Sequence, residues 1–158
     1  MAALVPEPVA RVKHALTALG AEDTVTVLDS TVPTAVAAAA ALGCEVAAIT
    51  NSLVFDLDGA PLLILASGAA RVDVRKVAVQ LGTGRIRRAS PEFVLDHTGQ
   101  EVGGVAPVGH PEKIRTLLDE SLAAQPVLWA GAGDHHSMFS ITYEQLRRIT
   151  EAEEMPVR

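Results

Sequence analysis

The stretch from Ala47 to Ser67, AAITNSLVFDLDGAPLLILAS, constrains the fold of this chain more than any other. Its two halves are rich in aliphatic and β-branched residues, and between them stands Asp58-Gly59, a pair that favours tight two-residue turns. The stretch therefore predicts a β-hairpin. Because the two strands of a hairpin run antiparallel, any sheet that contains them is at least partly antiparallel.

Helices and strands alternate on both sides of the hairpin. Apolar residues at helical spacing, capping residues and terminal glycines predict helices over residues 9–19, 30–43, 74–81 and 90–99, and one that begins at Thr142. Apolar runs predict strands over residues 24–30, 85–89 and 137–141, and strands or buried segments over residues 114–122 and 126–133. We therefore expect one α/β domain spanning residues 1–158, with a mixed, mostly antiparallel sheet surrounded by helices.

The single cysteine and the lack of long apolar runs bear on where the protein works. Cys44 has no partner for an internal disulfide, as is usual in a reducing compartment. The N-terminal sequence lacks the basic-then-apolar order of a signal peptide, and no apolar run approaches the roughly 18 residues of a membrane span. We expect a soluble, cytoplasmic protein without a membrane partner.

The charged residues are unevenly placed along the chain. A net charge of −6 argues against a general binder of DNA or other nucleic acids. Residues 71–88 nevertheless hold six of the 13 lysines and arginines and one acid, Asp73, so this basic window has a local charge of +5. Two interpretations are open: a solvated surface, or a surface that contacts phosphate groups.

Side chains that could bind a metal ion or act as a nucleophile follow no known motif. The possible metal ligands Cys44, His110, Asp134, His135 and His136 have no zinc-site spacing. No G-x-S-x-G sequence is present, and Cys44 follows the expected end of a helix, where the dipole raises the pKa of a thiol. We expect neither a metal site nor a cofactor.

Two stretches remain as candidates for a functional site: GQEVGGVAPVGHP at residues 99–111 and AGAGDHHSMF at residues 130–139. In the first, Gly103 to Pro107 form the pattern G-x-x-x-P, in which glycines expose the backbone and a proline fixes it. Such a loop can present N–H groups to a carbonyl or a carboxylate. The alternative is a loop that only connects two elements.

With these segments in this order, the chain resembles the YbaK/prolyl-tRNA-deacylase family, the free-standing relatives of the editing domain inserted in bacterial prolyl-tRNA synthetases. The resemblance covers residues 9–150, and its segments include TAVAAAAALGCEVAAITNSLVF, GAARVDVRKVAVQLG, ASPEFVLDHTGQEVGGVAPVGHP and LDESL. Its most specific part is the G-x-x-x-P loop.

The resemblance implies a fold and an activity. The fold is a single α/β domain around a mixed sheet. The activity is hydrolysis of the ester between a wrong amino acid and the 3′ end of a tRNA, most often a tRNA for proline. Water is the nucleophile, the terminal ribose hydroxyl of the tRNA assists it, and no metal or cofactor takes part. The expected partners are mischarged tRNA and, beyond it, an aminoacyl-tRNA synthetase.

The resemblance also places the site. Catalytic roles fall to Asn51, Gly103 and Gly104, and contacts with the substrate to Ser52, Val105, Pro107, His110, His136 and Phe139. An acidic protein that handles tRNA must gather its positive charge near the phosphates, so we assign tRNA contacts to Arg71, Arg75, Lys76, Arg85 and Arg87. Arg71 and Arg75, four residues apart, are expected to share a helix face. His110 is equally expected as a structural loop residue, and His135 as a solvated one.

One position departs from the family pattern. Many members carry a lysine in a K-[ST]-L-[LVF] sequence, where it contacts the terminal tRNA phosphate or ribose, but here the sequence is Asn51-Ser52-Leu53-Val54. Asparagine forms hydrogen bonds and carries no charge. If Asn51 takes a shifted role, or another cation compensates, the chain is an editing hydrolase. If catalysis is lost with the lysine, the chain is a module that binds aminoacyl-tRNA or a synthetase.

Overall fold

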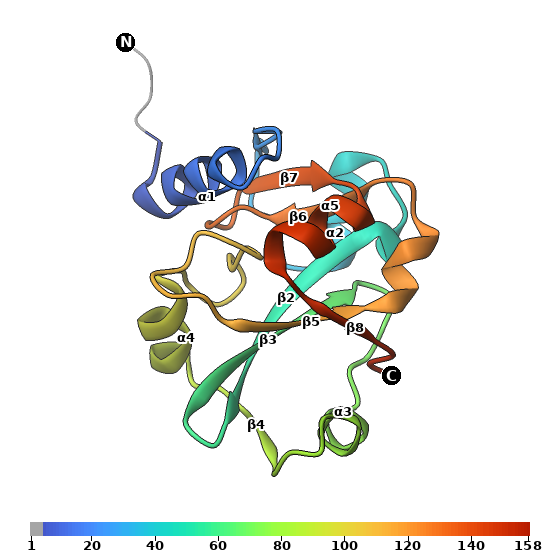
Figure 1. Cartoon of the computed structure of the whole chain (residues 1–158). Coiled ribbons are helices and arrows are strands. Elements are labelled where there is room, and N and C mark those ends of the chain that lie inside the picture. The colour runs from blue at the N-terminus through green and yellow to red at the C-terminus, as the bar shows by residue number, and fades with distance from the viewer. Residues whose placement is uncertain (1–4) are drawn as a thin grey trace.

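The computed structural model describes residues 5–158, which build one mixed β-sheet with helices on both faces (Figure 1). The strands are β1 (Thr26–Val27), β2 (Ile49–Leu57), β3 (Ala60–Ser67), β4 (Ile86–Arg88), β5 (Arg115–Asp119), β6 (Leu128–Gly131), β7 (Ser137–Ile141) and β8 (Glu153–Met155). The helices are α1 (Glu7–Ala18), α2 (Ala35–Leu42), α3 (Val74–Leu81), α4 (Pro91–Thr98) and α5 (Tyr143–Thr150), with short 3₁₀ helices η1 (Val46–Ala48) and η2 (Glu120–Ala124). The expected α/β class with a mixed sheet is confirmed.

The hairpin of β2 and β3 forms the middle of the sheet. The strand order is β1-β7-β6-β2-β3-β5-β8, and β4 pairs separately with β2. The β2–β6, β3–β5 and β5–β8 pairings are parallel and the other four are antiparallel. Asp58 and Gly59 both have positive φ, 51° and 88°, as a two-residue type I′ turn requires. The turn predicted from the sequence is therefore the one that closes the hairpin.

Both faces of the sheet are covered, which explains the continuous apolar run of β3. Leu63 and Leu65 enter the larger core, to which α1, α4 and α5 contribute, and they are fully buried. Leu62 and Ile64 enter the smaller core on the opposite face, beneath α3, and are fully buried as well. On that second face α2 packs its alanines against Ile49.

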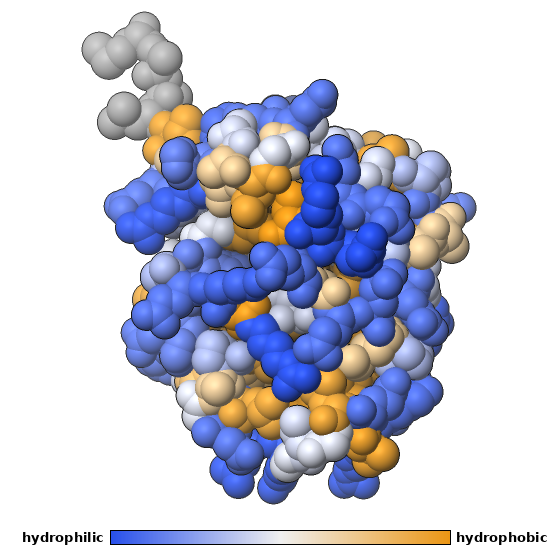
Figure 2. Space-filling view, viewed as in Figure 1, coloured by the Kyte–Doolittle hydropathy of each residue, from blue (hydrophilic) through white to orange (hydrophobic). Residues whose placement is uncertain are grey.

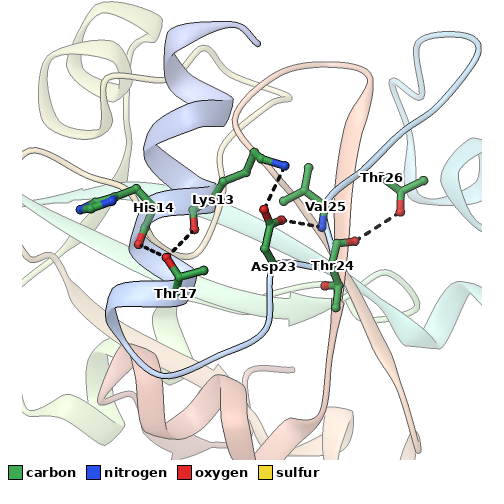
Figure 3. Close-up of polar contacts among 7 residues, drawn as sticks. All are labelled: Lys13, His14, Thr17, Asp23, Thr24, Val25 and Thr26. Carbon is green, nitrogen blue, oxygen red and sulfur yellow. Dashed lines mark hydrogen bonds and ion pairs between the residues drawn. The ribbon is translucent and has the colours of Figure 1, made fainter. Parts of the chain in front are cut away.

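The chain between α1 and β1 is fixed by polar contacts (Figure 3). Lys13 of α1 forms an ion pair with Asp23 at 2.9 Å, and Asp23 accepts a hydrogen bond from the Val25 amide at 3.2 Å. The Thr24 hydroxyl donates to the Ser140 carbonyl at 2.7 Å and accepts from the Ser140 amide at 3.0 Å. These contacts hold α1 against the β7 side of the sheet.

Three details differ from the expectations. α3 begins at Val74, as predicted, because the Asp73 side chain accepts a hydrogen bond from the Lys76 amide and caps the helix. Arg71 therefore lies before the helix, and the expectation that it shares a helix face with Arg75 is wrong. β1 is shorter than the predicted strand, since Thr24 uses its side chain to reach β7. β8, which the sequence analysis did not predict, pairs in parallel with β5.

The surface is polar over most of the view in Figure 2, and hydrophobic residues gather at its lower end, where α3 and β4 lie in Figure 1. The smaller core reaches the surface there, because apolar side chains such as Leu57, Val74 and Leu81 are only partly buried. Within residues 5–158, no helix has both the length and the apolar character that a membrane crossing requires.

Candidate active site

The site begins at an interruption in the pairing of β2. One edge of β2 pairs with β3 along eight residues. The other edge pairs with β6 through Ile49 and Thr50 and with β4 through residues 55–57, which leaves residues 51–54 without a strand partner on that side. The two residues that flank a two-residue turn, here Leu57 and Ala60, form a hydrogen-bonded pair. Hydrogen-bonded and non-hydrogen-bonded pairs alternate along an antiparallel ladder, so the backbone N–H and C=O groups of Ser52 and Val54 point away from β3. They face the interruption.

A cleft of about 590 Å³ lies at this interruption. It is lined by residues 49–55 of β2, by residues 32–35 at the start of α2, by part of the loop after α4, and by the β6–β7 connection. Adjacent residues of a strand point to opposite faces. The cleft therefore passes around the exposed edge of β2 and has one side on each face of the sheet.

Four of the predicted site residues come together in the cleft: Asn51, Ser52, Gly103 and Val105. Five others do not line it: Gly104, Pro107, His110, His136 and Phe139. Phe139 is completely buried in the larger core, so its assignment to the substrate pocket is wrong. Its position on β7 beside Ala130 gives it a packing role.

The two adjacent histidines exchange the places expected for them. His135, predicted to be solvated, lines the cleft, and its Nε2 is buried without a hydrogen-bond partner, 3.7 Å from a Glu101 carboxylate oxygen. His136, predicted to line the pocket, is exposed. Asp134 causes this arrangement by accepting hydrogen bonds from the backbone amides of His136, at 2.9 Å, and Ser137, at 2.8 Å.

The glycine-rich loop is held in shape by its own hydrogen bonds. The Gly104 amide donates to the Glu101 carbonyl at 2.9 Å, and the Ala106 amide donates to the side-chain oxygen of buried Gln100 at 2.7 Å. The amides of Gly103 and Val105 donate to no group within residues 5–158. Gly103 and Val105 thus keep free backbone donors, and both residues line the cleft.

Gly104 has a different role from the one predicted. Its N–H is already bonded, and a Cβ at this position would lie 3.0 Å from the Cα and carbonyl carbon of Asp134. The residue is a glycine because the loop packs directly against the β6–β7 connection. By contrast, Gly103 has a φ of 89°, and a Cβ there would lie 3.5 Å from the His135 ring.

His110 belongs to the same loop and does not line the cleft. Its Nε2 is 2.8 Å from the Ala106 carbonyl, and because a carbonyl oxygen only accepts, Nε2 carries the proton. Burial lowers the pKa of His110, while the bond to Ala106 acts in the opposite direction. Of its two expected roles, the contact favours the structural one, since this residue fixes the carbonyl that precedes Pro107.

A cation missing from the predicted set lies in the cleft. Arg88 lines it from β4, where it is opposite Phe55, and the guanidinium forms no ion pair with any described residue. Asn51 and Phe55 are both odd-numbered positions of β2 and share a face, so Arg88 and Asn51 lie on the same side of the sheet. The sequence could have indicated this position, because side chains alternate along a strand and Arg88 therefore points to the same face as Ile86, two residues earlier.

The basic window borders the cleft at both ends. Val72 and Arg88 line the cleft, and the predicted tRNA-binding residues Arg71, Arg75, Lys76, Arg85 and Arg87 are all exposed. Lys76 also donates a hydrogen bond to the carbonyl of Arg158 at 2.7 Å and so ties the C-terminal segment to α3. The contacts of these residues with tRNA stay a prediction.

Three side-chain hydroxyls in the cleft lack partners. The oxygens of Thr50, Ser52 and Ser137 are buried and meet no hydrogen-bonding group within residues 5–158. Thr50 and Ser137 carry no distinctive signal in the sequence, because serine and threonine are frequent in every kind of environment. Cys44 lies outside the cleft, and burial raises the pKa of its thiol. No group of three or more metal-binding side chains occurs within residues 5–158.

The fold and the cleft define a mixed-sheet α/β protein whose cleft carries free backbone donors and unpartnered hydroxyls. The chain belongs to the aminoacyl-tRNA editing domain family, whose sequence profile matches residues 29–149. The resemblance stated from the sequence is thereby confirmed.

The relatives include free-standing proteins and synthetases. The uncharacterised protein YwhH of Bacillus subtilis is 32% identical over 130 residues, which cover 82% of each chain. The proline–tRNA ligase of Bacillus licheniformis is 32% identical over 128 residues, or 75% of this chain but only 22% of the ligase. A crystal structure provisionally described as a trans-editing enzyme for prolyl tRNA synthetase superposes with a TM-score of 0.92, at 36% identity and with 99% of both chains covered.

Proposed function

We propose that residues 1–158 act as one free-standing editing domain that hydrolyses the ester between a small amino acid and the 3′-terminal ribose of a tRNA. The observation that carries this proposal is that the amides of Gly103 and Val105 are free, on an internally hydrogen-bonded loop that borders the cleft. Fixed N–H donors stabilise the negative oxygen that develops when an ester carbonyl is attacked. Membership of the editing-domain family supports the same activity.

The reaction then needs water as its second reactant. Water adds to the ester carbonyl carbon, and the developing oxyanion accepts hydrogen bonds from Gly103 and Val105. The bond between this carbon and the ribose oxygen breaks, the ribose oxygen takes a proton, and the amino acid leaves with a free carboxyl group. As the family resemblance implies, the neighbouring hydroxyl of the terminal ribose orients the water.

The opposite side of the cleft is suited to the tRNA end. Asn51 can hydrogen-bond the terminal ribose, and Arg88 can supply the positive charge that other members place at the Asn51 position. The rest of the 3′ end follows the exposed arginines of the basic window. This arrangement favours the interpretation in which another cation compensates for the missing lysine.

Likeness to proline–tRNA ligases supports a tRNA for proline as the substrate and a synthetase as a working partner in the cytoplasm. Editing is useful there because a pocket cannot strongly exclude a smaller amino acid by size: one methylene changes affinity by about 1–3 kcal/mol. A second enzyme that removes the wrong amino acid restores accuracy.

The test is a panel of tRNAs for proline charged with small amino acids, incubated with purified protein and assayed for released amino acid. The proposal expects turnover of at least one of them, unchanged by a chelator. If the folded protein binds charged tRNA but hydrolyses no ester in the panel, it is instead the non-catalytic binding module, whose activity was lost together with the lysine that Asn51 replaces. Turnover that stops on chelation would reveal a metal.

A further inference from the structure

The unpartnered polar atoms of the protein are concentrated in the cleft. Within residues 5–158, the buried side-chain nitrogen and oxygen atoms without a hydrogen-bond partner are Thr50 Oγ1, Ser52 Oγ, Ser137 Oγ and His135 Nε2, and all four residues line it. Thr50 and Ser137 are each only 2% exposed. A buried hydroxyl without a partner is unfavourable, so these atoms are suited to bonding a polar group that enters the cleft.

Strand register places the three hydroxyls on one face of the sheet. Thr50 of β2 lies opposite Ala130 of β6, which lies opposite Phe139 of β7, and directly paired residues share a face. Ser52 and Ser137 are each two residues from a member of this row and therefore point to the same side. Val105 packs in the core on this face, so this residue of the loop and the hydroxyls lie on the same side of β2.

A hydroxyl-bearing ligand matches this environment better than an apolar one. Val54, Val94 and Val105 give the cleft apolar walls, and an alanine methyl group would cover the hydroxyls without bonding them. A ligand hydroxyl both donates and accepts, as the serine and threonine side chains do. The α-ammonium group, which only donates, is better served by the carboxylate of Asp134, the one acidic residue that lines the cleft within the described chain.

We propose that the aminoacyl side of the cleft selects a small amino acid with a hydroxyl side chain, serine being the representative, over alanine. This inference rests on the proposed function, since it names the amino acid that the editing site removes. Serine would bridge the hydroxyls of β2 and β7, whereas alanine would leave them unsatisfied. A site built to bond a substrate hydroxyl rejects the analogue without it far better than a hydrophobic pocket rejects a small size difference.

The test compares the hydrolysis of seryl- and alanyl-tRNA for proline by wild-type protein and by Thr50→Val and Ser137→Ala variants. We expect wild-type kcat/KM to be about tenfold or more higher for the seryl ester, the size of one satisfied buried hydrogen bond. Each variant should lose most of this preference through slower hydrolysis of the seryl ester alone. Ser67→Ala is the matched control, because Ser67 is equally buried beside Thr50 but bonds the Ala47 carbonyl outside the cleft.

Equal wild-type rates for the two esters, or an equal loss for both in the variants, would overturn the proposal; the second result would assign the hydroxyls to the α-ammonium group. Selectivity is also measured without hydrolysis, through binding of 3′-seryl- and 3′-alanylamino-3′-deoxyadenosine, whose amide bonds resist cleavage. Tighter binding of the seryl compound, lost in Ser137→Ala, supports the selectivity even if the protein hydrolyses no ester. The absence of ester hydrolysis together with this binding preference would contradict only the hydrolase function.

Discussion

The hydroxyl of Ser67 donates to the Ala47 carbonyl at 2.9 Å, whereas the hydroxyls of Thr50 and Ser137 bond no group in the part of the chain that the structure describes. Their removal should therefore affect folding differently. We expect Ser67→Ala to lower the free energy of unfolding by about 1 kcal/mol, and Thr50→Val and Ser137→Ala to leave it unchanged or raise it. Urea denaturation of the three variants measures this. A loss in all three would mean that the cleft hydroxyls have a structural partner.

Arg88 combines a positive charge with a position in the cleft, as a phosphate-binding residue requires. If its guanidinium binds a phosphate of the tRNA end, Arg88→Gln should raise KM for charged tRNA about tenfold, the value of a charged hydrogen bond. Activity on an aminoacyl ester that lacks phosphate should not change. Arg148, exposed on α5 and away from the cleft, gives the control Arg148→Gln. Equal effects of the two substitutions would remove Arg88 from the site.

Among the elements, the loop of residues 99–111 depends on a close approach at Gly104. A Cβ there would meet Asp134 backbone atoms at 3.0 Å, so Gly104→Ala must displace the loop or the β6–β7 connection. We expect a loss of about 1–3 kcal/mol in the free energy of unfolding, together with a slower reaction. In the control Gly84→Ala, the new Cβ meets only the end of the Asp58 side chain, at 3.2 Å. Unaltered stability and turnover in Gly104→Ala would contradict the packing role.

His110 makes the same loop sensitive to pH. Burial lowers its pKa in the folded protein, so below the ordinary value of about 6.5 the unfolded chain binds the proton more readily. The free energy of unfolding should therefore be highest above pH 6.5 and fall as the pH drops from 6.5 toward the lowered pKa. We expect His110→Gln to show a weaker decline between pH 7 and pH 5 in urea titrations. Parallel curves for the two proteins would exclude this effect.

Sequence patterns predicted the elements well where apolar spacing or capping residues marked them. The β2–β3 hairpin is the clearest case, because Asp58-Gly59 permits few other conformations. β8 escaped prediction because Glu153–Met155 contributes backbone pairing with β5 and hardly any buried apolar surface. An edge strand of this kind leaves no periodic signal in the sequence.

The candidate site was harder to predict because it depends on register and loop geometry. Which of His135 and His136 lines the cleft depends on the local direction of the backbone. The hydrogen bonds to Asp134 determine this direction. Likewise, a glycine-rich sequence indicates that amides are accessible but not which of them are already bonded. Gly104 was therefore assigned the role that the structure leaves to Val105.

At the scale of the whole molecule, a net charge of −6 coexists with a basic window beside the cleft. Phosphate contacts release counterions, so affinity should fall with salt at a slope of about 0.7 per contact for a single strand. We expect Arg75→Glu combined with Arg87→Glu to weaken tRNA binding and flatten this slope, while activity on a minimal ester is unchanged. Binding titrations across salt concentrations decide it. Equal slopes would assign both arginines to an ordinary solvated surface.

The interruption beside β2 also has a consequence for solubility. Unpaired strand backbone normally invites another chain to add a strand, which leads to aggregation. Here the four unpaired residues lie between β4 and β6, within the sheet and not at its border, so an intruding strand would meet a neighbour at either end. The strands at the borders of the sheet are β1, β4 and β8, each only two or three residues long, and β8 begins with two glutamates. The protein can thus offer main-chain groups to a small molecule while withholding them from its own copies.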